Sequence, residues 1–425
     1  MLGKIINTFG TKLMTAIINL FIAIIISQYL GAAGKGEQVL LITTITFILV
    51  FSNIIGGSTL VYLTPRYSLS SLIIPSYIWT IFVSGIFFTG MYFFHFIKSE
   101  YVIHIAILSM LNSLVSINLS ILLGKEKIKT NNLISFIQTA SILISLFIMF
   151  WAFGENTIQT YITALYIAFT LSFVLSIIFL FPFIKKMELK KSVSGVLKEM
   201  IRFGLLNQIA TIAQILSFRI SYYLIEYFHG PADVGIYSNG VSLIEAVWLV
   251  STSITMVQYS RIVNSTDDKY SQKISLNLAK ISLMLAFIII IPLLFIPSTF
   301  YEFIFGREFG PVNEVMWTLA PGILFFNLSL VLGHYFSGTG KYHINTIAML
   351  AGLIITVVCG LIFIPLYNIV GAGITASISY IVTSLIITII FIRKAKCSVI
   401  DLMLKPADIK FYFNEMKLYL KPENK

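Results

Sequence analysis

Charged residues are scarce in this chain. Only 11% of its 425 residues are charged, whereas 57% are hydrophobic and the mean hydropathy is +0.92. An ordinary soluble domain carries about 25% charged residues, which keep its surface in contact with water. The 29 basic and 18 acidic side chains cannot coat the surface of a soluble protein of this length. The composition therefore excludes a soluble enzyme or a disordered chain and predicts that lipid is the solvent.

Cysteine and metal-binding patterns are also sparse. The two cysteines, Cys359 and Cys397, form neither a disulfide framework nor a metal-ligand spacing. The five histidines lie at the ends of apolar runs and do not cluster. The net charge of +11 comes from Lys and Arg that lie between apolar runs, which argues against a nucleic-acid patch. No metal or other cofactor is expected.

Long apolar runs fill most of the chain. A bilayer core of roughly 30 Å needs about 20 helical residues. Runs of that length predict twelve membrane-spanning helices, and no connection between them is long enough for a soluble domain. The fold class is therefore an all-α polytopic membrane protein. The expected spans cover about residues 10–30, 39–63, 72–96, 102–123, 133–153, 160–182, 201–228, 234–259, 274–297, 313–335, 344–367 and 369–392.

The longest connection between spans is basic and divides them into two groups of six. It covers residues 183–200, so we expect an N-terminal lobe of residues 1–182 and a C-terminal lobe of residues 201–392. The tail, 393–425, alternates apolar and basic residues, which predicts an amphipathic helix on the membrane surface.

Lysine and arginine predict the orientation of the spans. If the N-terminus is cytoplasmic, the outer loops contain only Lys35, Lys98 and Arg307, and nearly all other basic residues face the cytoplasm. Cytoplasmic loops of membrane proteins carry an excess of Lys and Arg. One miscounted span would reverse the later loops and destroy this asymmetry. The pattern therefore predicts that both termini are cytoplasmic.

The two halves share sequence features in the same order. Gly36 pairs with Gly235 after the first span of each half, at an offset of about 199 residues. A G-x-x-K-x-x-x-N pattern starts at Gly124 and again at Gly338, at an offset of about 214 residues. Paired segments fall on the same side of the membrane, so the repeat is parallel. Such a repeat is typical of transporters in which two six-helix bundles, related by a pseudo-two-fold axis, rock around a central cavity.

Arg219 is the deepest cation in an expected span. Glu245 lies at a similar depth in the next span, and a charge at this depth usually faces the protein interior and has a partner. One interpretation is a polar cavity wall in which Arg219 binds an anionic substrate and Glu245 tunes it or takes a proton. The alternative is an ion pair that joins two neighbouring helices. Three further residues share the helix face of Arg219: Gln208, Tyr223 and Glu226.

Three polar residues complete the candidate site, and two of them, Lys12 and Arg66, lie near the expected cytoplasmic boundary. Lys12 and Asn19 share a face of the first span, and Arg66 follows the second span. Snorkelling of the basic side chains to lipid headgroups explains Lys12 and Arg66. The alternative is a cationic entrance that receives a phosphate headgroup, for which the forked guanidinium of Arg66 is suited.

Several segments resemble the O-antigen and polysaccharide flippases of the multidrug/oligosaccharidyl-lipid/polysaccharide exporter superfamily. The resemblance covers nearly the whole chain in order. It is carried by Tyr29-Leu30-Gly31-Ala32-Ala33-Gly34-Lys35-Gly36-Glu37, Ala232-Asp233-Val234-Gly235-Ile236-Tyr237-Ser238, Ala320-Pro321-Gly322-Ile323 and Tyr335-Phe336-Ser337-Gly338-Thr339-Gly340-Lys341.

This resemblance implies flipping of undecaprenyl-pyrophosphate-linked oligosaccharide repeat units, of O-antigen or capsule type, to the outer leaflet of a bacterial inner membrane by alternating access. It implies a polysaccharide polymerase and a chain-length regulator as partners, and coupling to a proton or sodium gradient. The alternatives are a drug/cation antiporter of the same superfamily and a flippase for a lipid-linked peptidoglycan precursor, which usually has two further spans. A membrane enzyme is not expected, because the outer loops are short and their acids are scattered.

Overall fold

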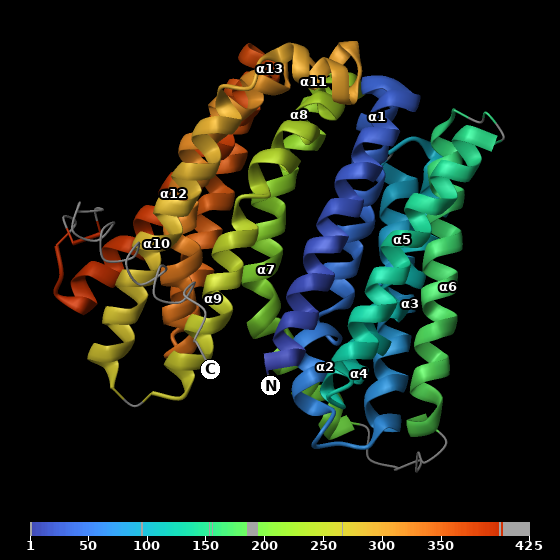
Figure 1. Ribbon diagram of the computed structural model, residues 1–425. Coiled ribbons are helices and arrows are strands. Elements are labelled where there is room, and N and C mark those ends of the chain that lie inside the picture. The colour runs from blue at the N-terminus through green and yellow to red at the C-terminus, as the bar shows by residue number, and fades with distance from the viewer. Residues whose placement is uncertain are drawn as a thin grey trace, which may run out of the picture.

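Helices form almost the entire chain in the computed structural model, which describes residues 2–94, 97–152, 154, 156–184, 194–265, 267–398 and 401–402 (Figure 1). No β-strand occurs within these ranges. The elements are α1 (Leu2–Ser52), α2 (Gly57–Leu63), α3 (Leu69–Phe94), α4 (Ser99–Gly124), α5 (Ile128–Ala152), α6 (Ile158–Ile184), α7 (Ser194–His229), α8 (Pro231–Glu245), α9 (Trp248–Val263), α10 (Asp268–Leu294), α11 (Ser298–Phe305), the 3₁₀ helix η1 (Arg307–Phe309), α12 (Val312–Gly338) and α13 (Tyr342–Ala395).

The helices account for the twelve expected spans. Among the described residues, eight helices are long and apolar enough to cross a membrane, and the two bent pairs within α7 and across α8–α9 raise the number to ten. α1 and α13 are 51 and 54 residues long, roughly 80 Å each if straight. Each turns back on itself instead, α1 at Gly31 and α13 at Asn368, and so supplies two spans (Figure 1). The prediction of an all-α polytopic membrane protein is confirmed.

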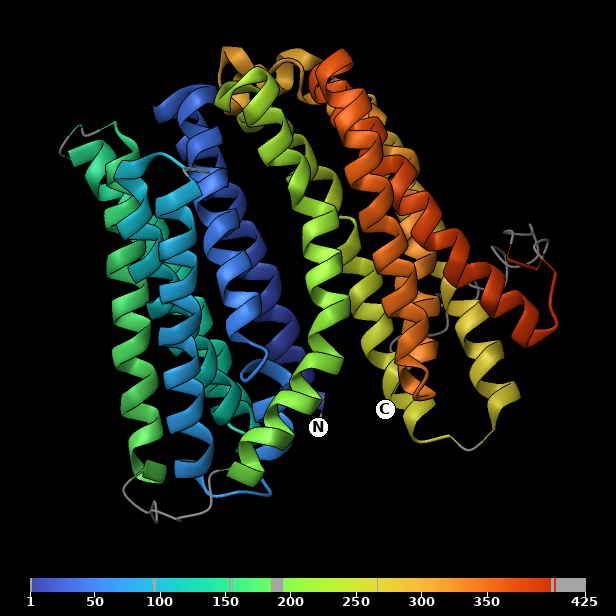
Figure 2. The ribbon, with the colours of Figure 1, turned by 180° about the vertical axis from the view of Figure 1, so that it is seen from behind.

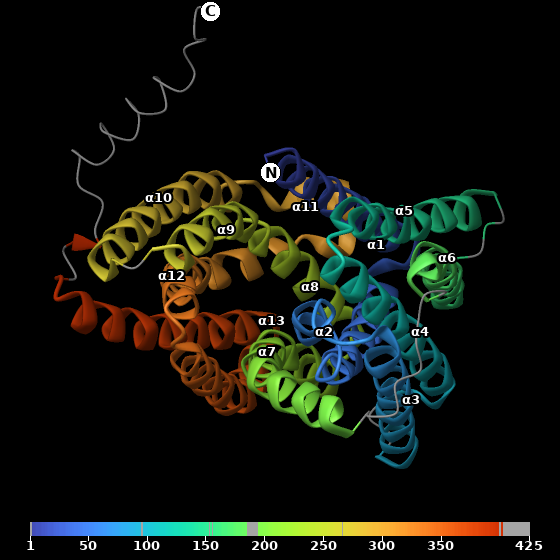
Figure 3. The ribbon, with the colours of Figure 1, turned by 90° about the horizontal axis from the view of Figure 1, so that it is seen from below.

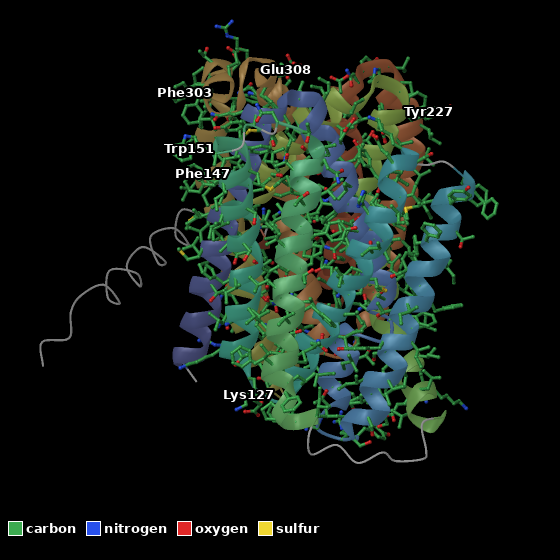
Figure 4. All side chains as sticks on the ribbon, turned by 90° about the vertical axis from the view of Figure 1, so that its right-hand side faces the viewer. Lys127, Phe147, Trp151, Tyr227, Phe303 and Glu308 are labelled. Atoms are coloured by element: carbon green, nitrogen blue, oxygen red, sulfur yellow. The ribbon has the colours of Figure 1, made fainter. Side chains whose placement is uncertain are left out.

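Aromatic side chains surround the molecule near one of its ends. Figure 4 places Glu308 at this end and Lys127 at the opposite one, which we call the Glu308 end and the Lys127 end. Trp151, Tyr227 and Phe303 are 73%, 81% and 83% exposed and lie toward the Glu308 end (Figure 4). Exposed aromatic rings are favoured at the boundary between hydrocarbon and water. The exposed apolar surface of this protein is therefore its lipid-facing surface.

The internal repeat is visible in the backbone. Gly31 lies at the turn between the two legs of α1, and Gly230 lies at the turn between α7 and α8. Both have positive φ, with φ/ψ of 67°/−172° at Gly31 and 98°/175° at Gly230. They are separated by the sequence offset of 199 residues. Gly154 and Asn368, separated by the offset of 214 residues, both have positive φ at the turn between the last two spans of each half. The parallel repeat predicted from sequence is thus present as matched turns with positive φ, a conformation that glycine adopts at little cost.

The two halves meet most closely at the Glu308 end. Among the helix pairs with extensive contact in the described ranges, α7, α8, α11 and η1 connect the second half to α1, α2 and α3. α9, α10, α12 and α13 pack instead within the second half and diverge from α3–α6 toward the Lys127 end (Figures 1 and 2). The molecule is closed at the Glu308 end and splayed at the Lys127 end.

Four features differ from the expected spans and connections. The second span is broken, since α1 ends at Ser52 and α2 begins at Gly57. The eighth is broken between α8 and α9, with a bend of 42°. The connection after α10 folds into α11 and η1. The basic connection ends earlier than expected, because α7 begins at Ser194. Most of the expected tail, 403–425, lies outside the described residues.

Candidate functional site

Arg219 and Glu245 form a two-point ion pair between α7 and α8. Nη1 of Arg219 donates to Oε1 of Glu245 at 3.1 Å, and Nη2 donates to Oε2 at 2.8 Å. The side chains are 29% and 14% exposed. Forked pairing of this kind is stronger than a single charged hydrogen bond because two parallel bonds fix the geometry. The ion pair expected from matching depth is therefore present, and its arginine remains partly accessible.

Aromatic rings surround this pair. The Tyr222 hydroxyl accepts a hydrogen bond from Nη1 of Arg219 at 3.3 Å, and the guanidinium carbon lies 5.5 Å from the centre of the Tyr222 ring. Four further rings pack together, and all six centroid distances among them lie between 4.9 and 5.7 Å: Phe218, Trp248, Phe326 and Tyr380. These rings, which we call the aromatic wall, join α7, α9, α12 and α13. The Arg219–Glu245 pair is therefore next to a well-packed part of the second half.

The break between α8 and α9 positions Glu245. Glu245 is the last residue of α8, and Trp248 is the first residue of α9. Between them the chain makes shorter-range bonds from Val247 N–H to Ile244 O and from Leu249 N–H to Ala246 O. Neither glycine nor proline occurs at this junction, which lies inside the expected span of residues 234–259. The sequence carries no local signal for this break.

Two residues of the predicted face contact the first half. The hydroxyl of Tyr223 lies 2.7 Å from Oγ1 of Thr44, and its ring stacks on Phe47 at 5.8 Å. Gln208 is 8% exposed, and its Nε2 donates to the backbone carbonyl of Asn53 at 3.3 Å. That carbonyl is available because α1 ends next to it. Tyr223 and Gln208 therefore join the halves on either side of the Arg219–Glu245 pair.

The remaining candidates lie apart from the pair. Glu226 is seven residues beyond Arg219, roughly 10 Å along α7, and is half-buried near Lys98 and Glu37. Lys12 and Asn19 are exposed on the first leg of α1. Arg66 is exposed at the Lys127 end, where its guanidinium lies over the Tyr62 ring at 3.5 Å and donates to the Tyr62 carbonyl. The structure does not bring Lys12, Arg66 and Arg219 into one cluster.

At the Glu308 end, the halves contact each other mainly through glycines and other small residues. A Cβ atom at Gly36 would lie 1.7 Å from the Pro231 carbonyl oxygen, and one at Gly235 would lie 2.1 Å from that of Ala32. The two glycines paired by the repeat thus meet each other across the interface. The Nδ2 of Asn239 donates to Ser27 at 2.8 Å beside them. Small residues allow two helices to approach this closely in a membrane.

Glu308 adds a polar contact to the same closure. Its Oε2 accepts a hydrogen bond from the backbone N–H of Ala32 at 2.6 Å, next to the turn at Gly31. Gln28 also donates to the carbonyl of Ile304 in α11, at 2.8 Å. An N–H that follows the break at Gly31 has no helical acceptor of its own, so the carboxylate satisfies it. The expected short outer loop therefore holds the two halves together.

Buried hydroxyl clusters lie within the second half. Ser217, Thr356 and Ser379 join α7 to both legs of α13 through contacts of 2.8–3.0 Å. Sequence reasoning missed this cluster because isolated Ser and Thr occur throughout apolar helices. Each hydroxyl can bond to its own helix, so neither type nor spacing marks a cluster. No group of three His, Cys, Asp or Glu side chains in the described part of the chain could hold a metal ion.

No model of a known protein family matches the chain. One curated protein, the capsular polysaccharide biosynthesis protein CapF of Staphylococcus aureus, is 26% identical over 162 residues. This match covers 37% of the chain and 41% of that protein's length.

Solved structures match over nearly the full length of the chain. The lipid II flippase MurJ in an inward closed conformation is similar with a TM-score of 0.72 and 16% identity, over 98% of this chain and 93% of MurJ. An inward-facing multidrug resistance MATE family transporter of the MOP superfamily is similar with a TM-score of 0.71 and 12% identity, over 92% of this chain and 98% of that one. The chain therefore has the two-lobe, twelve-span fold of MOP-superfamily transporters, and the expected architecture is confirmed.

Proposed function

We propose that the protein flips oligosaccharide repeat units linked to undecaprenyl pyrophosphate across a bacterial inner membrane by alternating access. The observation that carries the proposal is Arg219. It is a partly accessible arginine in the middle of a transporter fold, held by a single carboxylate close to the contact between the halves. A pyrophosphate group offers the same forked acceptor geometry as Glu245 and more charge, so it can compete for the guanidinium.

The asymmetry of lysine and arginine assigns the sides of the membrane. The Lys127 end carries most of the basic loops and therefore faces the cytoplasm. The conformation splayed at that end receives substrate from the cytoplasmic leaflet and is closed toward the outer one. Release requires the contacts at Gly36, Gly235 and Glu308 to open while the Lys127 end closes. The partial match to a capsular polysaccharide biosynthesis protein supports a glycan of capsule or O-antigen type.

Glu245 is the group through which an ion gradient would act. Removal of Arg219 from Glu245 by an anionic substrate would leave a largely buried carboxylate without its cation, and a coupling ion could then take the place of the arginine. Phe218 and Trp248 are partly exposed and offer flat apolar faces against which sugar rings can pack. A polymerase and a chain-length regulator would act on the glycan after it reaches the outer leaflet.

One observation favours a second function, export of organic cations. A carboxylate beside Tyr222 and Trp248 is also suited to a large cation, because aromatic faces attract positive charge. The two functions predict opposite effects of Arg219→Ala. This change removes the group that binds an anion, whereas it frees Glu245 to bind a cation.

Reconstitution tests the proposal. The full-length protein in sealed vesicles should accelerate leaflet exchange of an undecaprenyl-pyrophosphate-linked oligosaccharide, and Arg219→Ala should abolish the acceleration. Arg261→Ala removes an exposed arginine of α9 and is the matched control, with exchange unchanged. Absence of exchange by the wild-type protein would overturn the proposal. Ethidium efflux that rises in Arg219→Ala would establish the second function instead.

A further inference from the structure

A groove lies between the two halves near the Lys127 end. It has a volume of about 620 Å³, and its lining includes Thr59 and Tyr62 of α2, Phe203 and Ile209 of α7, and Tyr342, His343 and Ile347 of α13. α7 forms its floor, because this helix lies between α2 and the first leg of α13 (Figure 3). Pockets for small ligands have volumes of roughly 300–1,000 Å³. This interlobe groove is separate from Arg219, which lies ten residues, roughly 15 Å, beyond Ile209 along α7.

The walls of the interlobe groove are apolar and reach the lipid-facing surface. Ile209, Tyr342 and Ile347 are 42%, 51% and 55% exposed, although they lie on spans. The rings of Tyr62 and Phe203 pack together at 5.1 Å and form an aromatic side. An apolar chain can therefore enter from the bilayer and bury its surface against these apolar side chains. The lining alone predicts a hydrocarbon ligand.

Positive charge borders the same groove. The guanidinium of Arg66 lies over the Tyr62 ring, and one hydrogen bond to the Tyr62 carbonyl uses only one of its five N–H donors among the described contacts. Arg202 and Lys341 directly precede the lining residues Phe203 and Tyr342. The acid nearest in sequence, Glu199, accepts a hydrogen bond from Tyr67. An apolar groove with basic residues at its border matches an apolar chain that ends in phosphate.

The groove contacts both halves, which links its occupant to the transport cycle. Tyr62 belongs to the first half and Tyr342 to the second, and the first turns of α7 pack on the first half, where a Cβ at Gly204 would lie 1.6 Å from the Ile54 carbonyl oxygen. Closure of the Lys127 end would bring Tyr62 and Tyr342 together and change the groove. A ligand that fits only one state shifts the balance toward that state. An occupant that shares in the cycle is expected to be the cargo, not a bulk lipid.

We infer that the interlobe groove binds the polyprenyl chain of the lipid-linked substrate, with its phosphates against Arg66, before the glycan reaches Arg219. This inference rests on the proposed function and adds a first binding position to it. The chain enters sideways between α2 and α13, while the phosphates stay at headgroup depth. Arg66 would then select phosphate-bearing prenyl lipids at the cytoplasmic side, and Arg219 would act later in the cycle.

Binding of radiolabelled polyprenyl pyrophosphate to the full-length protein in phosphatidylethanolamine nanodiscs tests the inference. Ile347→Trp fills the groove and should weaken binding about tenfold or more. Ile354→Trp places the same ring on the same helix at a 62% exposed position outside the groove and should bind as wild type. Arg66→Gln should weaken binding of polyprenyl pyrophosphate about tenfold, the loss expected for a charged hydrogen bond, while binding of polyprenol stays unchanged. Monodisperse elution and an unchanged Tm verify that each variant is folded.

Competition separates the sources of phosphate. Unlabelled polyprenyl pyrophosphate should displace the label, whereas phosphatidylglycerol and inorganic pyrophosphate should not. Equal displacement by phosphatidylglycerol would show a general lipid site and overturn the inference. Wild-type affinity in Ile347→Trp would also overturn it. If Ile347→Trp and Arg66→Gln bind polyprenyl pyrophosphate as the wild type does, but leaflet exchange still depends on the protein, the groove is not the binding site and the proposed function stands. If the wild-type protein neither binds nor exchanges the lipid, both fail.

Discussion

The two ends of this molecule hold its halves together to different extents. At the Glu308 end, two close backbone contacts, Gly36 on Pro231 and Gly235 on Ala32, are joined by the carboxylate of Glu308 on the N–H of Ala32. At the Lys127 end, one such backbone contact, Gly204 on Ile54, comes from the start of α7, while a groove separates Tyr62 from Tyr342. This single contact lies on a helix with a bend of 42°, so it can adjust more easily than the three contacts at the Glu308 end.

The two halves have a similar backbone, but the conformation of the whole molecule is closed at one end and open at the other. The backbone repeat places matched turns in both halves, yet the chemistry gathers in the second half, with Arg219, Glu245 and the aromatic wall. The closed end uses glycines related by the repeat, so their contact is self-complementary. Packed interfaces tend to have two discrete arrangements, which makes this end suited to act as a gate. The following changes test that contrast between the ends, from the largest expected effect to the smallest.

Gly36→Leu should have the largest effect. Its Cβ would lie 1.7 Å from the Pro231 carbonyl, so the Glu308 end cannot close in the observed way. Overpacking of this kind costs about 1–3 kcal/mol or more. Disulfide crosslinking of Ser27→Cys with Asn239→Cys, in a background without Cys359 and Cys397, should fall severalfold. Gly90→Leu, at a position with open space around it, is the control. Undiminished crosslinking would show that this end does not depend on the glycine contact.

Arg219→Ala should have the second largest effect, because it should abolish transport and lower the stability of the protein. Removal of one partner from a fully buried pair costs about 3–5 kcal/mol. The cost here is smaller, since Arg219 is 29% exposed and water screens the charge left on Glu245. Thermal unfolding should show that Arg219→Ala with Glu245→Ala is more stable than Arg219→Ala alone. If the double variant also regains transport, the pair is structural and the substrate binds elsewhere.

Gly204→Leu tests the Lys127 end by the same logic as Gly36→Leu. Its Cβ would lie 1.6 Å from the Ile54 carbonyl oxygen, so the start of α7 must move away from the first half. We expect the Ser27–Asn239 crosslink to remain, because α7 bends between this segment and the Glu308 end. Leaflet exchange should slow severalfold without stopping. Loss of the crosslink would mean that the two ends are rigidly coupled.

Asn368→Ala should cost about 1–2 kcal/mol of stability. Asn368 has a φ of 52° at the turn of α13, and its Nδ2 donates to Asp233 of α8 at 2.7 Å. Alanine keeps the strained backbone and loses the hydrogen bond. Asn368→Gly loses the bond but relieves the strain, as at the matched Gly154, so its stability should lie near that of the wild type. Urea titration in mild detergent compares the three. Equal loss in both variants would show that the strain contributes little.

Lys98→Ala should have the smallest effect. Lys98 donates to Glu37 at the surface of the Glu308 end, and this hydrogen bond raises the pKa of Lys98 above its usual value. Exposed pairs contribute about 0–1 kcal/mol. Because the pKa is raised in the folded state, the contribution is fully present below the ordinary lysine pKa of about 10.4 and is lost as pH rises through the higher folded value. The Tm difference between wild type and variant should shrink only above that pH. A difference that shrinks at neutral pH would contradict the assignment.

Hydropathy and local signals predicted most of the fold. Twelve runs of about 20 apolar residues became twelve spans, since the length of a helix across lipid follows from bilayer thickness. Glycine marked the turns at Gly31 and Gly230, because a positive φ is costly for other residues. The breaks at Asn53–Gly56 and Ala246–Val247 were not predicted, and the second contains no residue that disfavours a helix. Such breaks depend on what packs around them.

For the candidate site too, part of the arrangement could be predicted from sequence and part could not. Equal depth in neighbouring spans predicted that Arg219 and Glu245 would meet, because an unpaired charge in lipid is costly. Lys12 and Arg66 were expected near the cytoplasmic boundary, as snorkelling side chains or as a cationic entrance, and the structure leaves both exposed.

The sequence by itself thus determined that the chain is a twelve-span, two-part membrane protein and which charges inside it need partners. Those properties depend on single helices and on the depth of each residue. Only the tertiary structure decided that Gly36 meets Gly235, that Glu308 satisfies Ala32, and that a groove opens between Tyr62 and Tyr342. Each of these depends on the distance and angle between two helices that are far apart in the chain. Apolar periodicity does not encode that relation, because one apolar face can pack against lipid or against another helix.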